Sequence, residues 1–245
     1  MVINEKKDLY KLKKYVPIII MLPFAGGNTY SYKDLIKFIY PGIDVLCPEL
    51  PGRGFLSGEP LISDMEQLSD HVFDRWLRYL PDESRYIIYG HSMGALLGLL
   101  LIHKIKNKGM KLPEQLIVSG RKGPGFLNRD NDIHALPSDM FKKKIKEMGG
   151  TLDDILENKE LMDYFEPILR SDITAVETFK YVNKEIIDTP VSVWFGADEQ
   201  FCKQAIISWQ KETNKPIKVR EMSGNHFFIF DHAQEIANHL SQMFL

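Results

Sequence analysis

Residues 86–94 read Tyr86-Ile87-Ile88-Tyr89-Gly90-His91-Ser92-Met93-Gly94, and they carry the strongest indication of the fold class. Its first four residues are β-branched or aromatic, which favours a buried strand. The residues that follow, 94–105, are apolar almost all round and predict a helix buried against a sheet. Between the two stands a Gly-x-Ser-x-Gly sequence, which is typical of a sharp strand-to-helix turn. Five residues with two glycines also occur by chance, so the strand before and the helix after make the pattern specific.

Ser92 is the candidate nucleophile at this turn. The turn forces its central residue into a strained backbone conformation, and glycines on either side relieve the clash of neighbouring elements. The first N–H groups of the next helix have no acceptor within that helix, so the Met93 N–H can face a developing oxyanion. The loop after the first expected strand, Pro23-Phe24-Ala25-Gly26-Gly27, offers a second donor, for which we expect the Ala25 N–H. A plain tight turn is the alternative for that loop.

A serine hydroxyl needs a base within hydrogen-bond reach before it can attack. His226 follows a late expected strand, which fits the chain order serine, acid, histidine. His232 is its nearest rival. The acid is expected after the preceding strand, where Asp198 and Glu199 are neighbours and only one can meet the imidazole. A spacing of three residues after Gly196 favours Glu199, whereas a turn that is tighter by one residue would present Asp198.

Short apolar runs alternate with amphipathic stretches, which predicts parallel strands joined by helices. Region 136–181 shows only helical periodicity, with interruptions at Gly149-Gly150 and Pro167. We therefore expect one α/β domain over 1–245, with 136–181 as a helical lid over the carboxyl ends of the strands. A small domain apart from the site is the alternative. The expected strands are 17–21, 44–47, 86–89, 115–119, 191–195 and 217–221, and further helices are 65–79 and 233–244.

Composition narrows the class of protein. The chain has 245 residues, of which 44% are hydrophobic and 26% charged, and this balance is that of one globular domain with a sizeable core. A net charge of −2 gives no electrostatic case for nucleic acid or an anionic membrane as partner. Two cysteines, Cys47 and Cys202, are too few for a disulfide framework or a four-ligand zinc site. The apolar run 16–22 is too short to span a bilayer, and we expect a cytoplasmic protein.

The chain resembles the type II thioesterases, the stand-alone editing enzymes that accompany nonribosomal peptide synthases, polyketide synthases and animal fatty acid synthase. The resemblance covers nearly the whole length and implies the α/β-hydrolase fold. Two departures are Glu199, where the family usually has Asp, and Asn225, where it commonly has Gly. The motifs that carry the resemblance are Leu22-Pro23-Phe24-Ala25-Gly26-Gly27, Pro48-Glu49-Leu50-Pro51-Gly52-Arg53-Gly54, Gly90-His91-Ser92-Met93-Gly94-Ala95, Pro167-Ile168-Leu169-Arg170-Ser171-Asp172 and Gly224-Asn225-His226-Phe227.

This resemblance implies hydrolysis of a thioester between an acyl group and the phosphopantetheine arm of an acyl or peptidyl carrier protein. It calls for no metal and no cofactor, and we expect a monomer. Cationic side chains at Arg121, Lys122 and 142–144 are candidates for attracting an acidic carrier. An esterase or lipase that acts on small free esters would use the same catalytic residues. A non-catalytic binding module is a third reading, because a fold alone does not prove activity.

Overall fold

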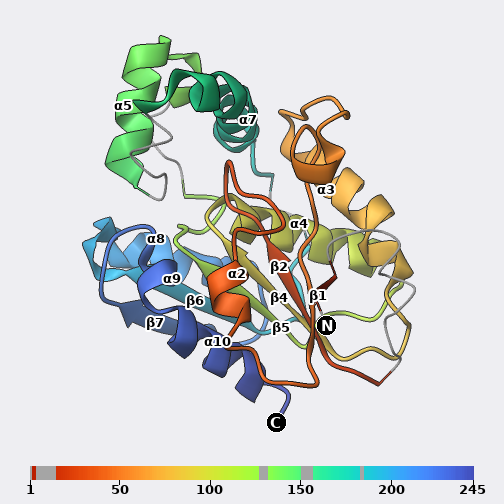
Figure 1. Ribbon diagram of the computed structural model, residues 1–245. Coiled ribbons are helices and arrows are strands. Elements are labelled where there is room, and N and C mark those ends of the chain that lie inside the picture. Colours follow the sequence, from red (N-terminus) through yellow and green to blue (C-terminus); the bar gives the residue numbers. More distant parts are fainter. Residues whose placement is uncertain (1, 4–14, 127–131, 150–156, 183–184) are drawn as a thin grey trace.

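The chain forms an open parallel sheet with helices on both faces (Figure 1). The computed structural model describes residues 2–3, 15–126, 132–149, 157–182 and 185–245. Every neighbouring strand pair is parallel, and the strand order is β1-β3-β2-β4-β5-β6-β7. The strands are β1 (Val2–Ile3), β2 (Ile18–Leu22), β3 (Asp44–Leu46), β4 (Tyr86–His91), β5 (Gln115–Ser119), β6 (Val191–Gly196) and β7 (Lys218–Met222).

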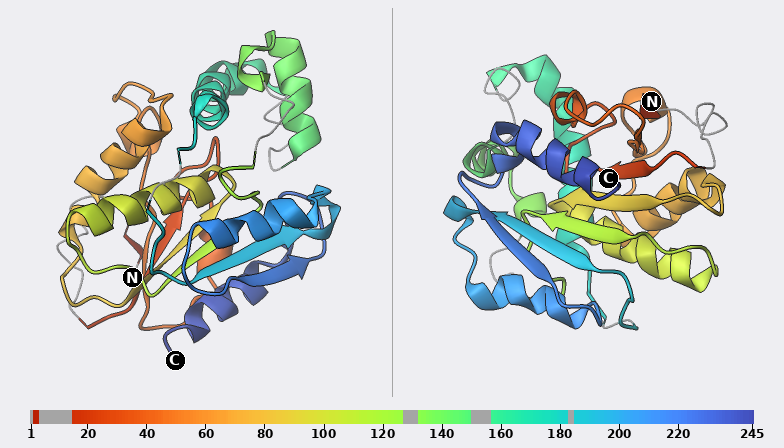
Figure 2. Two further views of the ribbon diagram at one scale, coloured as in Figure 1. Left: turned by 180° about the vertical axis from the view of Figure 1, so that it is seen from behind. Right: turned by 90° about the horizontal axis from the view of Figure 1, so that it is seen from below.

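Alternate residues of the central strands enter two separate cores, as the period of a strand requires. In β2, Ile18 and Ile20 belong to one core, whereas Ile19 and Met21 belong to the other. The first core is closed by α3 (Met65–Arg75), α4 (Met93–Asn107) and α8 (Lys203–Ile207). The second is closed by α2 (Lys33–Ile36), α9 (Phe228–Asp231) and α10 (Ala233–Gln242), on the opposite side of the sheet (Figure 2).

The expected strands agree with the observed ones to within one or two residues at each end. The expected helix 65–79 ends earlier, at Arg75, and a 3₁₀ turn over Leu77–Tyr79 follows it. The two-residue strand β1 was not expected, because so short a segment carries no periodicity. The parallel sheet with helices on both faces confirms the predicted fold class.

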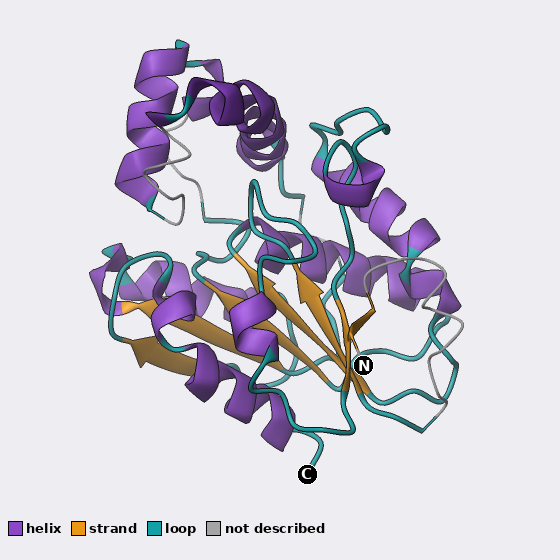
Figure 3. Ribbon diagram, in the orientation of Figure 1, coloured by secondary structure: helices purple, strands orange, loops and turns teal. Residues whose placement is uncertain are grey.

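A helical segment lies above the carboxyl-terminal edge of the sheet (Figures 1 and 3). It contains α5 (Ser138–Met148) and α7 (Lys159–Thr178), and the described residues between 136 and 181 include no strand. Phe141 and Ile145 of α5 pack with Met162, Leu169 and Ile173 of α7 in a small core of their own. Residues 150–156 of the expected insertion, with Gly150, lie outside the described residues.

Pro167 does not interrupt the helix there, and this prediction was wrong. It lies inside α7, which continues to Thr178. A proline within a helix removes the hydrogen bond to the carbonyl four residues earlier, here that of Asp163. Both Pro167 and Asp163 are exposed, so water can satisfy that carbonyl. In the described parts of the chain, no helix combines the length and the apolar character needed to cross a membrane.

Candidate active site

Ser92 occupies the strained turn between β4 and α4. Its φ is 53°, in the left-handed region that residues other than glycine rarely adopt. A Cβ at Gly90 would lie 2.1 Å from the Gly94 carbonyl oxygen, and a Cβ at Gly94 would lie 2.3 Å from that of Leu22. Both glycines are therefore needed for strand, turn and helix to pack so closely. The strained turn that the sequence predicts is present.

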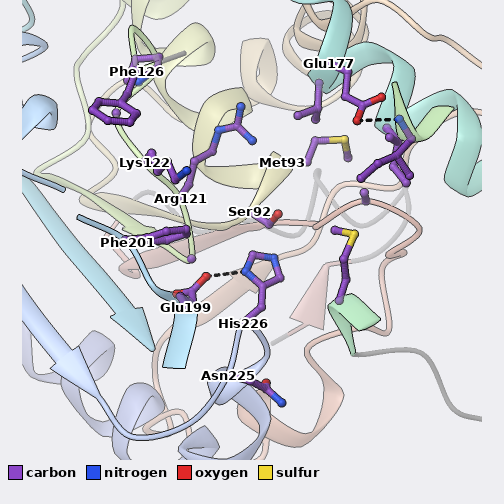
Figure 4. Close-up of a pocket in the computed structure, with 18 of the residues that line it drawn as sticks. Ser92, Met93, Arg121, Lys122, Phe126, Glu177, Glu199, Phe201, Asn225 and His226 are labelled. Atoms are coloured by element: carbon purple, nitrogen blue, oxygen red, sulfur yellow. Dashed lines mark hydrogen bonds and ion pairs between the residues drawn. The ribbon is translucent and has the colours of Figure 1, made fainter. Parts of the chain in front are cut away.

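His226 and Glu199 are joined directly. The Nδ1 atom of His226 lies 2.6 Å from Oε1 of Glu199, and the other carboxylate oxygen accepts the Gly196 N–H at 2.8 Å. The Glu199 side chain is only 2% exposed, whereas Asp198 is exposed. The Asp198 N–H donates to the Gly224 carbonyl at 3.0 Å. Of the two neighbouring carboxylates, the structure brings Glu199 and not Asp198 to the imidazole. In Figure 4 the His226 ring lies between Ser92 and Glu199.

The imidazole of His226 packs beside a second, buried imidazole. The ring centroids of His91 and His226 are 4.8 Å apart, and Nδ1 of His91 lies 2.9 Å from Ser119 Oγ. Burial lowers the pKa of His91 well below its usual value, and the charge that the nearby His226 can carry lowers it further. His91 is thus a neutral structural residue of the turn, next to Ser92.

Gly120 has no side chain that could clash with these two rings. The sequence alone did not indicate this role. The φ of Gly120 is +61°, and a Cβ there would lie 2.4 Å from the His91 ring and 3.1 Å from the His226 ring. The residue follows β5, and its N–H donates to the Trp194 carbonyl at 3.0 Å. No local pattern could reveal this role, because it depends on β5 lying beside β4.

The loop after β2 reaches the site through Ala25. The N–H groups of its two glycines are taken, since Gly26 donates to Asp172 Oδ2 at 2.7 Å and Gly27 donates to the Phe24 carbonyl at 2.8 Å. Ala25 lines the same pocket as Ser92 and Met93. Met93 is the first residue of α4, so its N–H has no acceptor within the helix.

These residues open into a cavity of about 490 Å³ between the sheet edge and the helical segment (Figure 4). One wall carries Ser92, Glu199 and His226, and the opposite wall comes from α5 and α7. The helical wall consists of Glu147, Met148, Ile173, Val176 and Glu177. A cavity of this size is large enough for a small organic ligand.

The other histidines lie elsewhere. His71, His103 and His239 lie within helices. His232, the rival of His226, faces Ser223 and Glu235 on the surface, with Nε2 3.0 Å from Ser223 Oγ and Nδ1 3.1 Å from the carboxylate. His134 pairs with Glu177 at 2.6 Å. Within the described ranges, no group of three or more His, Cys, Asp or Glu side chains is arranged to hold a metal ion.

The five cationic side chains singled out in the sequence fall into two groups. Arg121 and Lys122 line the cavity itself, and the Lys122 ammonium lies 5.4 Å from the centre of the Phe201 ring. The run 142–144 lies on α5, where Lys144 pairs with Glu147 at 2.7 Å. Arg121 and Lys122 can therefore contact a ligand in the cavity, whereas the run 142–144 belongs to the helical segment above it.

Glu49 is a buried carboxyl beneath the loop after β2. It is fully buried, and one oxygen accepts the Thr29 N–H at 3.3 Å, whereas the other has no hydrogen-bond partner among the described residues. Burial raises the pKa of Glu49 to about 7, against the lowering effect of the Thr29 N–H and the Arg53 guanidinium. The protein therefore holds a carboxyl that titrates near neutral pH.

We expect Glu49→Gln to flatten the pH dependence of stability. Between about pH 4.5 and 7 the folded protein keeps a proton on Glu49 that the unfolded chain has lost. The free energy of unfolding thus falls as pH rises from about 4.5 to about 7. Above about pH 7 the full destabilisation from the buried carboxylate is present. Glutamine does not titrate, so the variant should gain stability relative to wild type from about pH 5 to about pH 8. Urea denaturation at several pH values in this range measures the free energy of unfolding of both proteins. The same pH dependence in the variant and the wild type would contradict the prediction.

The parallel sheet and the strained Gly-x-Ser-x-Gly turn define a protein of the α/β-hydrolase fold. The solved type II thioesterase BorB, from the borrelidin biosynthetic cluster, superposes with a TM-score of 0.84 and 25% identity, covering 93% of this chain and 92% of that one. The chain belongs to the thioesterase family, because the model of the thioesterase domain matches residues 17–244. It is an enzyme, a hydrolase that acts on thioester bonds.

Curated relatives support the same family. Thioesterase PikA5 of Streptomyces venezuelae is 30% identical over 231 residues, which make up 93% of this chain and 80% of that protein. The gramicidin S biosynthesis protein GrsT of Aneurinibacillus migulanus is 28% identical over 221 residues, 89% of this chain and 85% of that protein. The resemblance to type II thioesterases that the motifs indicated is confirmed.

Proposed function

We propose that this enzyme, as a monomer, hydrolyses acyl thioesters carried on the phosphopantetheine arm of acyl or peptidyl carrier proteins and thereby removes stalled or wrong acyl groups. Its catalytic residues would be Ser92 as nucleophile, His226 as base and Glu199 as the acid that orients the base. The contact of 2.6 Å between His226 Nδ1 and Glu199 Oε1, in the cavity that Ser92 lines, carries this proposal. The relatives from gramicidin S and borrelidin biosynthesis support the carrier-bound substrate.

In the first half of the reaction Ser92 Oγ attacks the thioester carbonyl carbon while His226 Nε2 takes the hydroxyl proton. The Met93 and Ala25 amides stabilise the oxyanion that forms. The carbon–sulfur bond then breaks, and the imidazolium gives its proton to the leaving sulfur, which departs as the free thiol of the pantetheine arm. An acyl ester on Ser92 remains.

The second half repeats these steps with water. His226 removes a proton from the water, and the resulting hydroxide adds to the ester carbonyl. Collapse of the tetrahedral intermediate returns the proton to Ser92 Oγ and releases the free acid. Glu199 accepts a hydrogen bond from Nδ1 throughout, and this orients the ring so that Nε2 can accept a proton.

The helical segment over the sheet edge is proposed as the substrate wall. Side chains of α5 and α7, among them Met148, Ile173 and Val176, line the cavity opposite Ser92. An acyl chain bound there would be shielded from water by apolar surface. We accordingly propose residues 136–181 as a lid inserted in a single hydrolase domain over 1–245.

The test compares two substrates with the same acyl chain, a thioester on a phosphopantetheinylated carrier protein and a small oxygen ester. We expect kcat/KM to be higher by at least about tenfold for the carrier thioester. Equal or better turnover of the oxygen ester would favour the esterase reading. Binding of the acyl carrier without turnover of either substrate would favour a non-catalytic binding module.

A further inference from the structure

Asp172 of α7 reaches from the helical segment to the loop after β2. Its side chain is fully buried, and its carboxylate accepts three hydrogen bonds. The Oδ2 atom accepts the Gly26 N–H at 2.7 Å and Nη1 of Arg53 at 2.6 Å, and the Oδ1 atom accepts Nη2 of Arg53 at 2.7 Å. A carboxylate of the lid therefore binds the backbone of the loop that carries Ala25.

Arg53 binds the same loop and, together with Asp172, forms a clamp on it. It comes from the loop after β3, its side chain is 3% exposed, and its Nη1 atom also donates to the Gly27 carbonyl at 3.1 Å. Two parallel hydrogen bonds between a guanidinium and a carboxylate fix both groups in one plane. Three segments that are far apart in sequence thus meet at Gly26 and Gly27.

The clamp determines where the Ala25 N–H points. This N–H belongs to the peptide unit whose carbonyl, that of Phe24, accepts the Gly27 N–H at 2.8 Å. The following peptide unit is held by Asp172 through the Gly26 N–H. Because each unit is planar with its N–H opposite its carbonyl, fixing both units fixes the direction of the Ala25 N–H.

Helix α7 also touches the loop through an apolar contact. Gly26 has a φ of +77°, and a Cβ there would lie 2.4 Å from Leu169 Cδ2. Leu169 stands three residues before Asp172, so both side chains lie on the same face of the helix. Ala25 itself packs against the small core that Leu169 shares with α5. The helix and the loop therefore cannot shift independently.

We propose that Asp172 is a positioning residue for the oxyanion hole: through Gly26 and Arg53 it holds the Ala25 amide in place, and so couples the lid helix α7 to the chemical step. This rests on the proposed function, in which the Ala25 N–H binds the oxyanion. A buried ion pair is in itself weak evidence for stability, since removing two charges from water is costly. The two hydrogen bonds that join this pair to one loop, from the Gly26 N–H to Asp172 and from Arg53 to the Gly27 carbonyl, are better explained by the geometry that they fix.

The test is Asp172→Asn, which keeps the size of the side chain and removes its charge. Loss of one oxyanion donor typically costs about 10²–10³-fold in kcat, and a misplaced donor should cost part of that, about 10- to 100-fold. KM should stay within about twofold, because the donor acts on the transition state and not on bound substrate. The matched control is Glu166→Gln, which breaks the ion pair of Glu166 with Arg170 on the same helix, away from the loop, and should leave kcat near wild type.

A second readout separates positioning from a merely structural role. An alkyl trifluoromethyl ketone adds to Ser92 and places an oxyanion in the hole, so its inhibition constant should rise by the same factor as kcat/KM falls. Arg53→Lys, which keeps the charge but loses the planar pair of hydrogen bonds, should show the same pattern. The loss in the Asp172→Asn and Arg53→Lys double variant should be well below the product of the two single losses.

Two outcomes would overturn the proposal. One is a folded Asp172→Asn enzyme with the kcat and ketone affinity of wild type, and the other is a rise in KM alone. If Asp172→Asn does not fold, Arg53→Lys decides by the same criteria. Failure of the wild-type enzyme to hydrolyse any acyl thioester would instead contradict the proposed function. Failure of the proposed function can thus be told apart from failure of the positioning role of Asp172.

Discussion

Ser92→Ala is expected to lower kcat for thioester hydrolysis by about 10⁶-fold, the scale of loss when a serine hydrolase loses its nucleophile. The remaining amides and the imidazole cannot form the acyl enzyme without the hydroxyl. The fold should survive, because the Ser92 side chain makes no capping hydrogen bond to α4 and alanine keeps the Cβ that this strained position already accommodates. The loss should therefore be one of chemistry and not of structure.

Two measurements check this expectation. Steady-state hydrolysis of an acyl carrier thioester gives the rate, and mass spectrometry of the intact protein detects an acyl group on Ser92 in the wild type and none in the variant. Ser57→Ala, at an exposed serine outside the site, is the matched control and should behave as wild type. Residual activity above about a hundredth of wild type in the Ser92 variant would contradict the role of the hydroxyl.

Glu199→Gln is expected to lower kcat by about 10⁴-fold, as when the acid of a triad is replaced by its amide. The carboxylate accepts from Nδ1 of His226 at 2.6 Å, whereas an amide can turn its NH₂ group toward that nitrogen. The imidazole would then carry its proton on Nε2 and could not take the one on Ser92. KM should change little, because the substrate does not touch Glu199 in this mechanism.

Asp198→Asn is the matched comparison, since it removes one negative charge from the adjacent residue. Asp198 is exposed, and the imidazole pairs with Glu199 instead, so the loss of Asp198 should change kcat by no more than about threefold. Circular dichroism and thermal unfolding of both variants show whether the fold is kept. A larger loss at position 198 than at 199 would assign the acid to Asp198.

The elements with strong local patterns could be predicted from the sequence. The run from β4 to α4 combines a β-branched strand, a glycine-flanked turn and an apolar helix, and each signal depends only on neighbours in the chain. The strand β1 and the continuation of α7 through Pro167 could not be predicted. A two-residue strand has no period to detect, and whether a proline is tolerated depends on water reaching the freed carbonyl.

Among the site residues, Ser92 and His226 could be placed by chain order and turn chemistry, because the carboxyl ends of parallel strands meet at one edge. The choice between Asp198 and Glu199 remained open, since adjacent side chains point in different directions and one residue of loop length decides which of them meets the imidazole. Gly120 gave no signal, because its importance lies in contacts with rings from two other segments.

The fold class, the turn at Ser92 and the order of the proposed catalytic groups along the chain could be inferred from sequence alone, since these depend on local periodicity and backbone sterics. Tertiary packing, in contrast, sets the pairing of Glu199 with His226, the space that Gly120 leaves for the rings, and the clamp of Asp172 and Arg53 on the loop that carries Ala25. These contacts join residues 26 to 146 positions apart. Their geometry follows from how the elements pack, which no short stretch of sequence encodes.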